Sequence, residues 1–429
     1  MKILVLSQYW HPENGVPQRR WTWLTGILQA GGHEVTVIAP PPHYKRSISL
    51  REWLKSGGIS AASTTEDGAN GEHVLRSGYF PSGRSLTKRI FNQAWAALSM
   101  ISTVVRPSGP LSGYRPDIII GTVPALPTAA VTLLAAKRFR TPYVIDLRDA
   151  WPALFKESGN WNSGTGAPSL RERILRHGPF QLLVSATEIM IETVLRSASG
   201  IVTTSSRLEA IVSEKHSAPT ATVRNVFPSP YYRRGVGAER PQNSLNVLYA
   251  GTLGRAQKLE NALLAAKIAR QSGVEVSLRF IGDGAAWDAL VQRADELDID
   301  LRIEHQLTPE ELGAHYEWAD TALVHLADWD SLEVAVPSKT YELMSNRIHI
   351  SGVVRGETAD LIESLHAGDV IAPNEPYALA QLWGELSSDR SRLEVTDEGR
   401  RWVEQQRAQD APSALLGLLK QVMRGHEGT

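Results

Sequence analysis

The sequence predicts two doubly wound α/β domains, each built on a parallel sheet, that face each other across a cleft. The apolar runs expected to form strands are continuous rather than alternating, as is typical of parallel strands buried on both faces. Each half of the chain also opens with a strand, a glycine-containing loop and a helix: residues 1–7 precede Gly15, and residues 246–250 precede Gly251. We therefore expect the chemistry between the two domains, at the carboxyl ends of the strands.

The N-terminal domain is predicted to span residues 1–230, with strands and helices in alternation. Residues 56–71 and 158–169, rich in Ser, Thr and Gly, are expected to be exposed loops. The uncharged run 118–136 approaches the ~20 residues of a membrane span, but two prolines interrupt it, which predicts a strand, a turn and a helix instead. The predicted elements are strands over 2–7, 33–39, 117–121, 143–146 and 200–204, and helices over 19–30, from 128, and over 180–198.

A linker of residues 231–245 is predicted to lead into a second domain, residues 246–405. The final segment, residues 406–429, is expected to be a helix that packs back on the N-terminal domain. The predicted strands of the second domain are 247–249, 276–281, 301–304, 321–325, 348–353 and 369–372, with helices between them and a last, interrupted helix over 378–423.

The composition is that of an ordinary globular protein. The chain has 429 residues, of which 42% are hydrophobic and 21% charged, enough for two or three domains. It contains no cysteine, which excludes a thiolate nucleophile and a cysteine-based zinc site. A net charge of −1 excludes a generally basic nucleic-acid binder. Met1 leads directly into a strand without a signal-peptide pattern, so a cytoplasmic location is expected.

Residues 73–116 contain no acidic side chain, which makes this stretch locally basic. They include the amphipathic pattern 90–98, with apolar residues at helical spacing. Basic residues beside an apolar helical face predict a peripheral contact with an anionic membrane, on the inner face of the plasma membrane. A helix whose apolar face is simply core explains the spacing equally well. The basic residues are Arg76, Arg84, Lys88, Arg89, Arg106 and Arg115.

The turn at residues 251–254 is predicted to bind a phosphate. It begins with Gly251, ends with Gly254, and separates an apolar strand from a helix, so that backbone N–H groups can point at an anion. Arg255 and Lys258 follow and could meet further phosphate charge. The alternative is that both are solvated charges on the first turn of a helix.

A second helix start is predicted at Pro337, followed by Ser338 and Lys339. Proline suits the first helical turn, and a helix N-terminus presents free N–H groups to an anion. Glu342, one turn further on, could accept hydrogen bonds from a ribose diol. The alternative is a glutamate that only neutralises its own helix dipole.

Charged residues also follow the strand at 143–146. Ionised side chains at the end of a buried strand are costly unless they are paired or used, which directs attention to Arg148 and Asp149. An internal salt bridge at the strand end is the alternative. Asp283 and Gly284 occupy a further strand-to-helix turn, which by itself is a weak signal.

In its motifs the chain resembles family 4 retaining glycosyltransferases of the GT-B fold, which has two Rossmann-like domains. It is most similar to the branch that builds bacterial O-antigen, capsule and exopolysaccharide. The motifs recur in order from residue 2 to about 380. They are Tyr9-Trp-His-Pro-Glu13-Asn-Gly15, residues 32–41, Asp146-Leu-Arg-Asp149-Ala-Trp-Pro152, Asn225, Tyr249-Ala-Gly251, Phe280-Ile-Gly-Asp-Gly284 and Pro337-Ser-Lys-Thr-Tyr-Glu342.

The resemblance implies roles for these residues. Glu342 would bind the ribose of a nucleotide-sugar, Lys258 and Arg255 its diphosphate, and Asp149 and Glu333 sugar hydroxyls, with Arg148 positioning Asp149. Gly15 would let the backbone approach a phosphate or the acceptor closely. The rest of the nucleotide-sugar site would come from Gly251, Gly254, Asp283, Gly284, Ser338 and Lys339.

The chain departs from the family at two of these positions. Val334 stands where the family has a second Glu, and Glu333 or backbone is expected to replace it. Thr252 stands where the family has Arg, and Arg255 is the expected substitute. The triplets Asp298-Ile-Asp300 and Asp328-Trp-Asp330 could suggest a metal, but the cationic turn already supplies positive charge, so no obligatory metal or cofactor is expected.

The activity implied is transfer of a sugar, with retention, from a nucleotide-sugar to a lipid-linked or saccharide acceptor. The attack would be front-face, and the acceptor hydroxyl would give its proton to the departing phosphate. A nucleotide-sugar epimerase of similar architecture is the alternative enzyme, and a catalytically silent subunit that binds nucleotide-sugar or glycan is the non-enzyme alternative. A dehydrogenase is disfavoured because the first turn lacks Gly-x-Gly-x-x-Gly.

Overall fold

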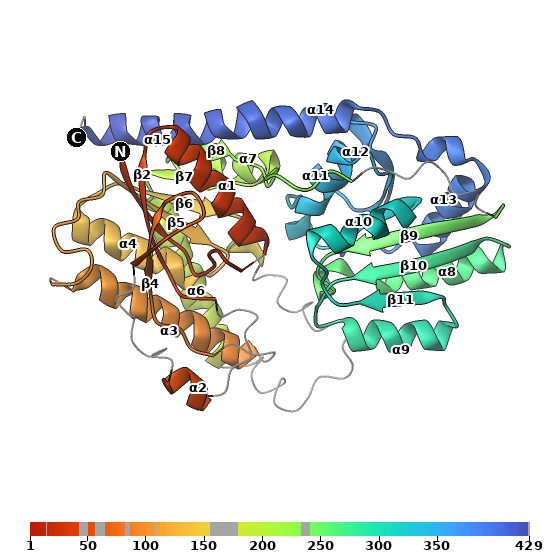
Figure 1. Cartoon of the computed structure of the whole chain (residues 1–429), viewed down its shortest axis with the longest axis horizontal. Coiled ribbons are helices and arrows are strands. Elements are labelled where there is room, and N and C mark those ends of the chain that lie inside the picture. Colours follow the sequence, from red (N-terminus) through yellow and green to blue (C-terminus); the bar gives the residue numbers. More distant parts are fainter. Residues whose placement is uncertain are drawn as a thin grey trace. The chain divides into compact units, whose positions relative to one another are not determined.

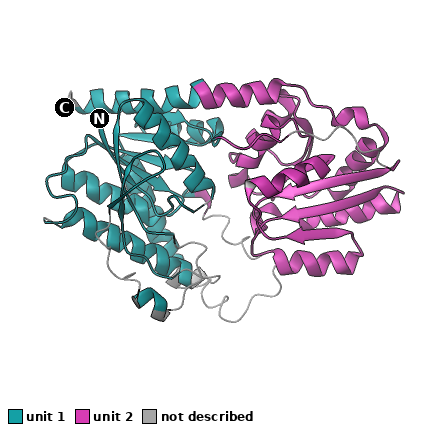
Figure 2. Cartoon of the chain, in the orientation of Figure 1, with its two compact units in different colours: residues 1–152, 179–227, 409–429 teal, residues 153–178, 228–408 magenta. Residues whose placement is uncertain are grey.

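The computed structural model describes residues 1–13, 15–42, 50–55, 65–81, 86–106, 108–154, 179–232 and 241–427. They divide into two compact units (Figure 2). Unit 1 comprises Met1–Pro152, Pro179–Phe227 and Gln409–Thr429. Unit 2 comprises Pro228–Ala408 and Ala153–Gly178, and only residues 153 and 154 of the latter segment are described.

Unit 1 is built on sheet A, which is parallel except for its edge strand β3. Its strand order is β3-β4-β2-β1-β5-β6-β7-β8. The strands are β1 Lys2–Leu6, β2 Glu34–Ala39, β3 Thr65–Asp67, β4 His73–Arg76, β5 Ile118–Val123, β6 Tyr143–Leu147, β7 Gly200–Thr203 and β8 Thr220–Thr222. The helices are α1 Val16–Ala30, α2 Leu50–Lys55, α3 Leu86–Val105, α4 Pro127–Phe139, α6 Pro179–Arg196, α7 Ser206–Lys215 and α15 Ala411–Glu427.

Helices cover both faces of sheet A, as the continuous apolar strands require. Helices α3, α4 and α6 lie side by side on one face, and α1 and α15 on the other (Figure 1). The central strands β1, β5 and β6 are buried along their lengths, apart from Lys2. Burying apolar side chains on both faces of the strands is the main stabilising contribution to such a sheet.

Unit 2 is built on sheet B, with strand order β11-β10-β9-β12-β13-β14 and every pair parallel. The strands are β9 Ser244–Ala250, β10 Glu275–Ile281, β11 Leu301–Glu304, β12 Thr321–His325, β13 Ile350–Val353 and β14 Gly368–Ile371. The helices are α8 Glu260–Gln271, α9 Trp287–Leu297, α10 Pro309–Trp318, α11 Ser338–Ser345, α12 Glu357–Ser364, α13 Pro376–Ser388 and α14 Glu398–Gln405. Short 3-10 helices span Arg255–Gln257, Asp330–Leu332 and Arg390–Leu393, and a π-helix spans Gln406–Asp410.

The strand order identifies where each unit can bind a ligand. In a doubly wound sheet, ligands bind at the carboxyl ends of the strands where the order reverses. In sheet A this point lies between β1 and β5, and in sheet B between β9 and β12. The loops after β9 and β12 contain the glycine turn and the segment that leads into α11, two of the motifs singled out in the sequence.

The expected strands and helices are present, with small shifts at their ends. The structure adds the short elements β3, β4, β8 and α2. The two compact units do not end where the domains were expected to end. The units divide at 227/228 and 408/409, and β9 begins inside the expected linker, 231–245. The expected loop 158–169 lies outside the described residues.

The C-terminal helix α15 is part of unit 1, where it contacts β7, β8 and α1. The helix that leads toward it, α14, is part of unit 2 and contacts α11. A search of the described helices found none with the length and apolarity needed to cross a membrane.

Candidate functional site

Two glycine turns pack directly against each other at the carboxyl edge of sheet B. The N–H groups of Gly251 and Leu253 donate to the carbonyl oxygens of Ile281 (2.9 Å) and Asp283 (3.0 Å). A Cβ at Gly284 would lie 2.0 Å from the Leu253 oxygen, so the close packing excludes any side chain there. Two N–H groups of the first turn thus bind carbonyl oxygens of the protein. The sequence predicted that the N–H groups of this turn would point at a phosphate, and these two do not.

A short 3-10 helix, Arg255–Gln257, positions the basic residues that follow the turn. Lys258 comes next with a left-handed backbone (φ 42°), and its Nζ donates to Asn374 Oδ1 over 2.6 Å. The N–H of Ala327, which follows β12, donates to the carbonyl of Ala256 over 2.7 Å. This bond ties the loops after β9 and β12 together where the strand order reverses.

Arg355, which follows β13, joins the acidic residues that follow β12. Its Nη2 lies 2.8 Å from Asp328 Oδ1, 3.0 Å from Glu333 Oε1 and 3.8 Å from Asp330 Oδ1. Glu333, expected to contact sugar hydroxyls, is therefore ion-paired in this structure. Val334, which stands where the resemblance predicts a Glu, is buried, so the Glu of the family motif is replaced by an apolar core residue.

Asn374 follows β14 and links this acidic cluster to Lys258. Its Nδ2 donates to Asp328 Oδ2 over 3.3 Å, while its Oδ1 accepts from Lys258. Loops after β9, β12, β13 and β14 thus converge in one polar cluster. Sequence reasoning missed Arg355 and Asn374 because neither lies in a motif. The one available signal was that each follows shortly after a predicted strand of a parallel sheet.

Glu342 is buried on helix α11 and held by two donors. Its Oε1 accepts from Tyr316 on α10 (2.9 Å) and from Lys339 one turn earlier (3.0 Å). Lys339 Nζ also donates to the Tyr316 hydroxyl over 3.1 Å. Ser338 and Lys339 open α11 as expected, but the Lys339 ammonium is directed to Glu342 rather than being left for a phosphate.

Other acidic residues singled out in the sequence also have partners in the protein. Asp283 Oδ1 lies 2.7 Å from His305 Nδ1, and the His305 ring stacks on Trp287 with centroids 4.3 Å apart. Asp298 is ion-paired with Arg270 at 3.0 Å. Within the described part of the chain, no group of three or more His, Asp or Glu side chains is placed to hold a metal ion.

His325, the last residue of β12, lies buried behind Lys258. Its Nε2 is 3.2 Å from Asn261 Nδ2. Burial lowers the pKa of this imidazole to about 3, and the charge of Lys258 adds to the effect. A neutral His325 adds no further cation to this edge of the sheet.

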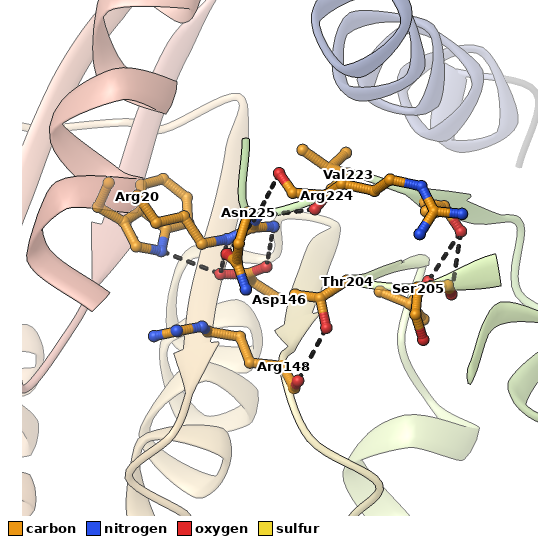
Figure 3. A network of polar contacts seen from close by, with 11 residues as sticks. Arg20, Asp146, Arg148, Thr204, Ser205, Val223, Arg224 and Asn225 are labelled. Carbon is orange, nitrogen blue, oxygen red and sulfur yellow. Dashed lines mark hydrogen bonds and ion pairs between the residues drawn. The ribbon is translucent and has the colours of Figure 1, made fainter. Parts of the chain in front are cut away.

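In unit 1 a buried ion pair organises the carboxyl edge of sheet A (Figure 3). Arg20 on α1 binds Asp146 on β6 through two bonds, Nη2 to Oδ1 at 2.8 Å and Nε to Oδ2 at 3.3 Å. Trp21 Nε1 donates to Asp146 Oδ2 over 3.0 Å. Arg20 Nη1 also donates to the carbonyl of Val223 (2.7 Å) and to Asn225 Oδ1 (3.2 Å).

Arg148 and Asp149 follow β6, but they do not form the salt bridge that was the alternative interpretation. The buried pair at this strand end is Arg20–Asp146, and sequence reasoning missed Arg20. Among the described residues no hydrogen bond or ion pair joins the side chains of Arg148 and Asp149, so the structure does not support the expected positioning of one by the other. Asp149 is exposed.

Polar side chains after β1 complete this edge. Thr122 Oγ1 donates to Ser7 Oγ over 3.1 Å, and Gln8 Nε2 donates to the Gln93 carbonyl over 3.1 Å. Gly15 precedes α1 with an extended backbone (φ −117°), and a Cβ there would lie 2.5 Å from Gln18 Oε1. Gly15 thus makes room for the Gln18 side chain.

Comparison with known proteins agrees with the motifs. Residues 15–226 match the glycosyl transferase 4-like domain. The putative colanic acid biosynthesis glycosyl transferase WcaI of Escherichia coli (strain K12) is 25% identical over 303 residues, which are 67% of this chain and 67% of that protein.

Two solved structures have a similar fold over the length of the chain. Sucrose-phosphate synthase from Thermosynechococcus elongatus superposes with a TM-score of 0.67 at 14% identity and covers 99% of each chain. HepE from Anabaena, solved with UDP and glucose, superposes with a TM-score of 0.58 at 14% identity and covers 100% of each chain. The GT-B fold expected from the sequence is confirmed.

Removing one partner of the buried pair should destabilise the protein strongly. Asp146→Asn leaves the Arg20 charge buried without compensation, which costs about 3–5 kcal/mol. The free energy of unfolding, measured by chemical denaturation, should fall by this amount. Arg196→Met is the matched control, because its exposed ion pair with Glu192 is worth no more than about 1 kcal/mol. Equal losses in the two variants would contradict the role given to the pair.

His325 should make stability depend on pH. Its pKa is about 3 in the folded protein, against about 6.5 in an unfolded chain. The unfolded state therefore binds more protons between these values, and stability is full above pH 6.5 and falls as the pH is lowered toward 3. The loss should reach about 2 kcal/mol at pH 5.

Unfolding measured from pH 7 to pH 4 tests this prediction. His325→Gln should flatten the pH dependence, whatever its effect on stability at pH 7. His426→Gln, at an exposed position on α15, is the control and should behave as the wild type. An unchanged slope in His325→Gln would refute the prediction.

Proposed function

We propose that this chain, a glycosyltransferase whose residues 15–226 form a glycosyl transferase 4-like domain, transfers a sugar with retention to a lipid-linked or saccharide acceptor in cell-envelope polysaccharide synthesis. The observation that carries the proposal is the cluster at the carboxyl edge of sheet B. There Lys258, Asn374, Arg355 and the acidic residues after β12 are joined by hydrogen bonds and ion pairs where the strand order of the sheet reverses, and Glu342 lies on α11, the helix that follows the same loop. The similarity to WcaI and to HepE supports a nucleotide-sugar as donor.

The donor would be held through its nucleotide by unit 2. Glu342 would accept hydrogen bonds from the ribose diol, and its bonds from Tyr316 and Lys339 keep the carboxylate in one orientation. Holding a binding group in place beforehand reduces the entropy lost when the ligand binds. Lys258 and Arg255 would stabilise the negative charge that develops on the diphosphate as it leaves.

The reaction itself would proceed by front-face attack. The acceptor hydroxyl would approach the anomeric carbon from the side of the leaving group and give its proton to the departing phosphate oxygen. Glu333 and Asp149 would contact sugar hydroxyls, and Glu333 would have to exchange its ion pair with Arg355 for that contact. We propose no metal ion in this step, because Arg255 and Lys258 supply the positive charge.

Unit 1 would rest on an anionic membrane through helix α3. Ile90, Phe91 and Leu98 are exposed by 38%, 62% and 63%, which is unusual for large apolar side chains on one helix. Lys88 and Arg89 are exposed beside them. Apolar side chains next to basic ones are the combination that binds the interface of an anionic bilayer.

Two residues of the expected membrane surface are used inside the protein instead. Arg76 is buried and bonded to Glu66, and Trp95 packs against Trp53 with ring centroids 6.1 Å apart. Arg84 lies outside the described residues. The proposed surface is therefore the exposed face of α3 near its N-terminus, on the cytoplasmic side of the plasma membrane.

Substitutions in the donor site should separate binding from turnover. Glu342→Gln should weaken binding of the matching nucleoside diphosphate by about 1.5–3 kcal/mol, the range for hydrogen bonds to a charged group. Lys258→Ala should lower turnover by roughly 10²-fold, measured in EDTA with the matching nucleotide-sugar.

Titration calorimetry with UDP, GDP, ADP and dTDP would identify the nucleotide and give both affinities. Glu317→Gln, an exposed neighbour on α10, is the control and should change neither quantity. If Glu342→Gln binds all four nucleotides as the wild type does, the proposed donor site is wrong.

Reversing charge on α3 should release the protein from membranes. Each basic residue near an anionic surface contributes about 1 kcal/mol, so Lys88→Glu with Arg89→Glu should reduce vesicle affinity roughly 30-fold or more. Flotation with phosphatidylglycerol-containing vesicles measures this directly.

The control is Lys137→Glu with Arg138→Glu, the same charge change at exposed positions near the end of α4. It should float like the wild type. Equal flotation of both double variants would show that α3 is ordinary surface.

A further inference from the structure

Arg148, directly after β6, presents a cation without an anion. Its Nε and Nη1 atoms are buried, and among the described residues no hydrogen bond or ion pair reaches them. In Figure 3 the marked contact of Arg148 is at its backbone oxygen, which accepts from Thr204 Oγ1 (2.9 Å), while the guanidinium extends away from it. A buried guanidinium without partners is costly, so such an arrangement is kept only where it has a use.

Two buried arginines of unit 1, Arg20 and Arg76, show what a fully paired guanidinium looks like here. Arg20 has Asp146 and the carbonyl of Val223. Arg76 has Glu66, the carbonyl of Pro40 at 3.0 Å and that of His11 at 2.9 Å. Both side chains use all three nitrogens inside the protein, which Arg148 does not.

The two acidic side chains near Arg148 do not pair with its guanidinium in the described part of the chain. Asp146 accepts hydrogen bonds from Arg20 and Trp21, and among the described residues neither Asp146 nor Asp149 forms an ion pair with Arg148. Burial lowers the pKa of Arg148, the charges of Asp146 and Asp149 oppose this shift, and the Arg20 charge adds to it. An arginine keeps its proton in such surroundings, so the positive charge remains at the edge of the sheet.

A second unpartnered donor lies at the same carboxyl edge. Trp10, in the segment after β1, has its Nε1 buried without a hydrogen-bond partner, and its ring packs on Trp21 with centroids 6.0 Å apart. Strand β1 lies at the point where the order of sheet A reverses, which is the position of ligands in doubly wound folds.

We propose that Arg148 binds a phosphate group at the carboxyl edge of sheet A. A planar guanidinium can donate two parallel hydrogen bonds to two phosphate oxygens, which a lysine cannot do. The phosphate belongs either to the diphosphate of the donor or to that of a lipid-linked acceptor, since both have the same chemistry. The inference rests on the proposed function, in which both molecules are substrates.

The test compares wild type, Arg148→Met and Arg148→Lys with three probes: UDP, farnesyl diphosphate and inorganic pyrophosphate. Arg148→Met should lose about 10- to 100-fold in affinity for at least one diphosphate probe. Its melting temperature should stay the same or rise, because an uncompensated buried charge has been removed. Arg115→Met, at an exposed position of unit 1, is the control and should change no affinity.

The pattern of losses identifies the source of the phosphate. A loss for UDP alone assigns Arg148 to the donor, and a loss for farnesyl diphosphate alone assigns it to the acceptor. If Arg148→Met unfolds, Arg148→Lys decides the question: weaker binding by this folded variant supports the proposal.

Unchanged affinity for all three probes in the folded variants would overturn the proposal. That outcome is distinct from failure of the proposed function, in which Glu342→Gln would bind nucleotides as the wild type does.

Discussion

The buried ion pair between Arg20 and Asp146 determines the chemistry of the carboxyl edge of sheet A. It joins helix α1 to strand β6 and, through Val223 and Asn225, to the segment after β8. Asp146 is directed to Arg20 and Trp21, and among the described residues it forms no ion pair with the neighbouring Arg148. Arg148 lies two positions after Asp146 in the chain and is the arginine for which we propose a phosphate ligand.

In unit 2 charged side chains of the candidate site are bound to partners within the protein. Lys258, Glu333 and Glu342 each have a partner within the protein, namely Asn374, Arg355 and Lys339. A donor that binds there must replace some of these contacts, so part of its interaction energy compensates for the bonds it breaks. In the site we propose, these groups are held in fixed orientations before a ligand binds. Such a site favours a ligand whose charges match the pattern over one that is merely charged.

Much of the fold was predictable from the sequence because its strands are continuous apolar runs separated by helices. The short elements β3, β4 and β8 were missed because few residues in each give little periodic signal. Motifs singled out Glu342 and Lys258, since each lies in or beside a short run of residues with a recognisable pattern. The sequence could not identify Arg20, Arg355 and Tyr316, because each contacts its partner only when elements distant in the sequence pack together.

Helix α15, the last helix of the chain, packs in unit 1 against elements that are synthesised much earlier. Its Leu415, Leu418, Leu419 and Val422 are buried in unit 1, and Gly200 on β7 lies so close that a Cβ there would be 2.8 Å from Val422. Domains generally fold in order as the ribosome produces them. Here α15 cannot cover β7 and β8 until the whole of unit 2 has been synthesised, because α15 follows unit 2 in the chain. The apolar side chains of α15 can therefore complete the core of unit 1 only after residues 411–427 have been synthesised.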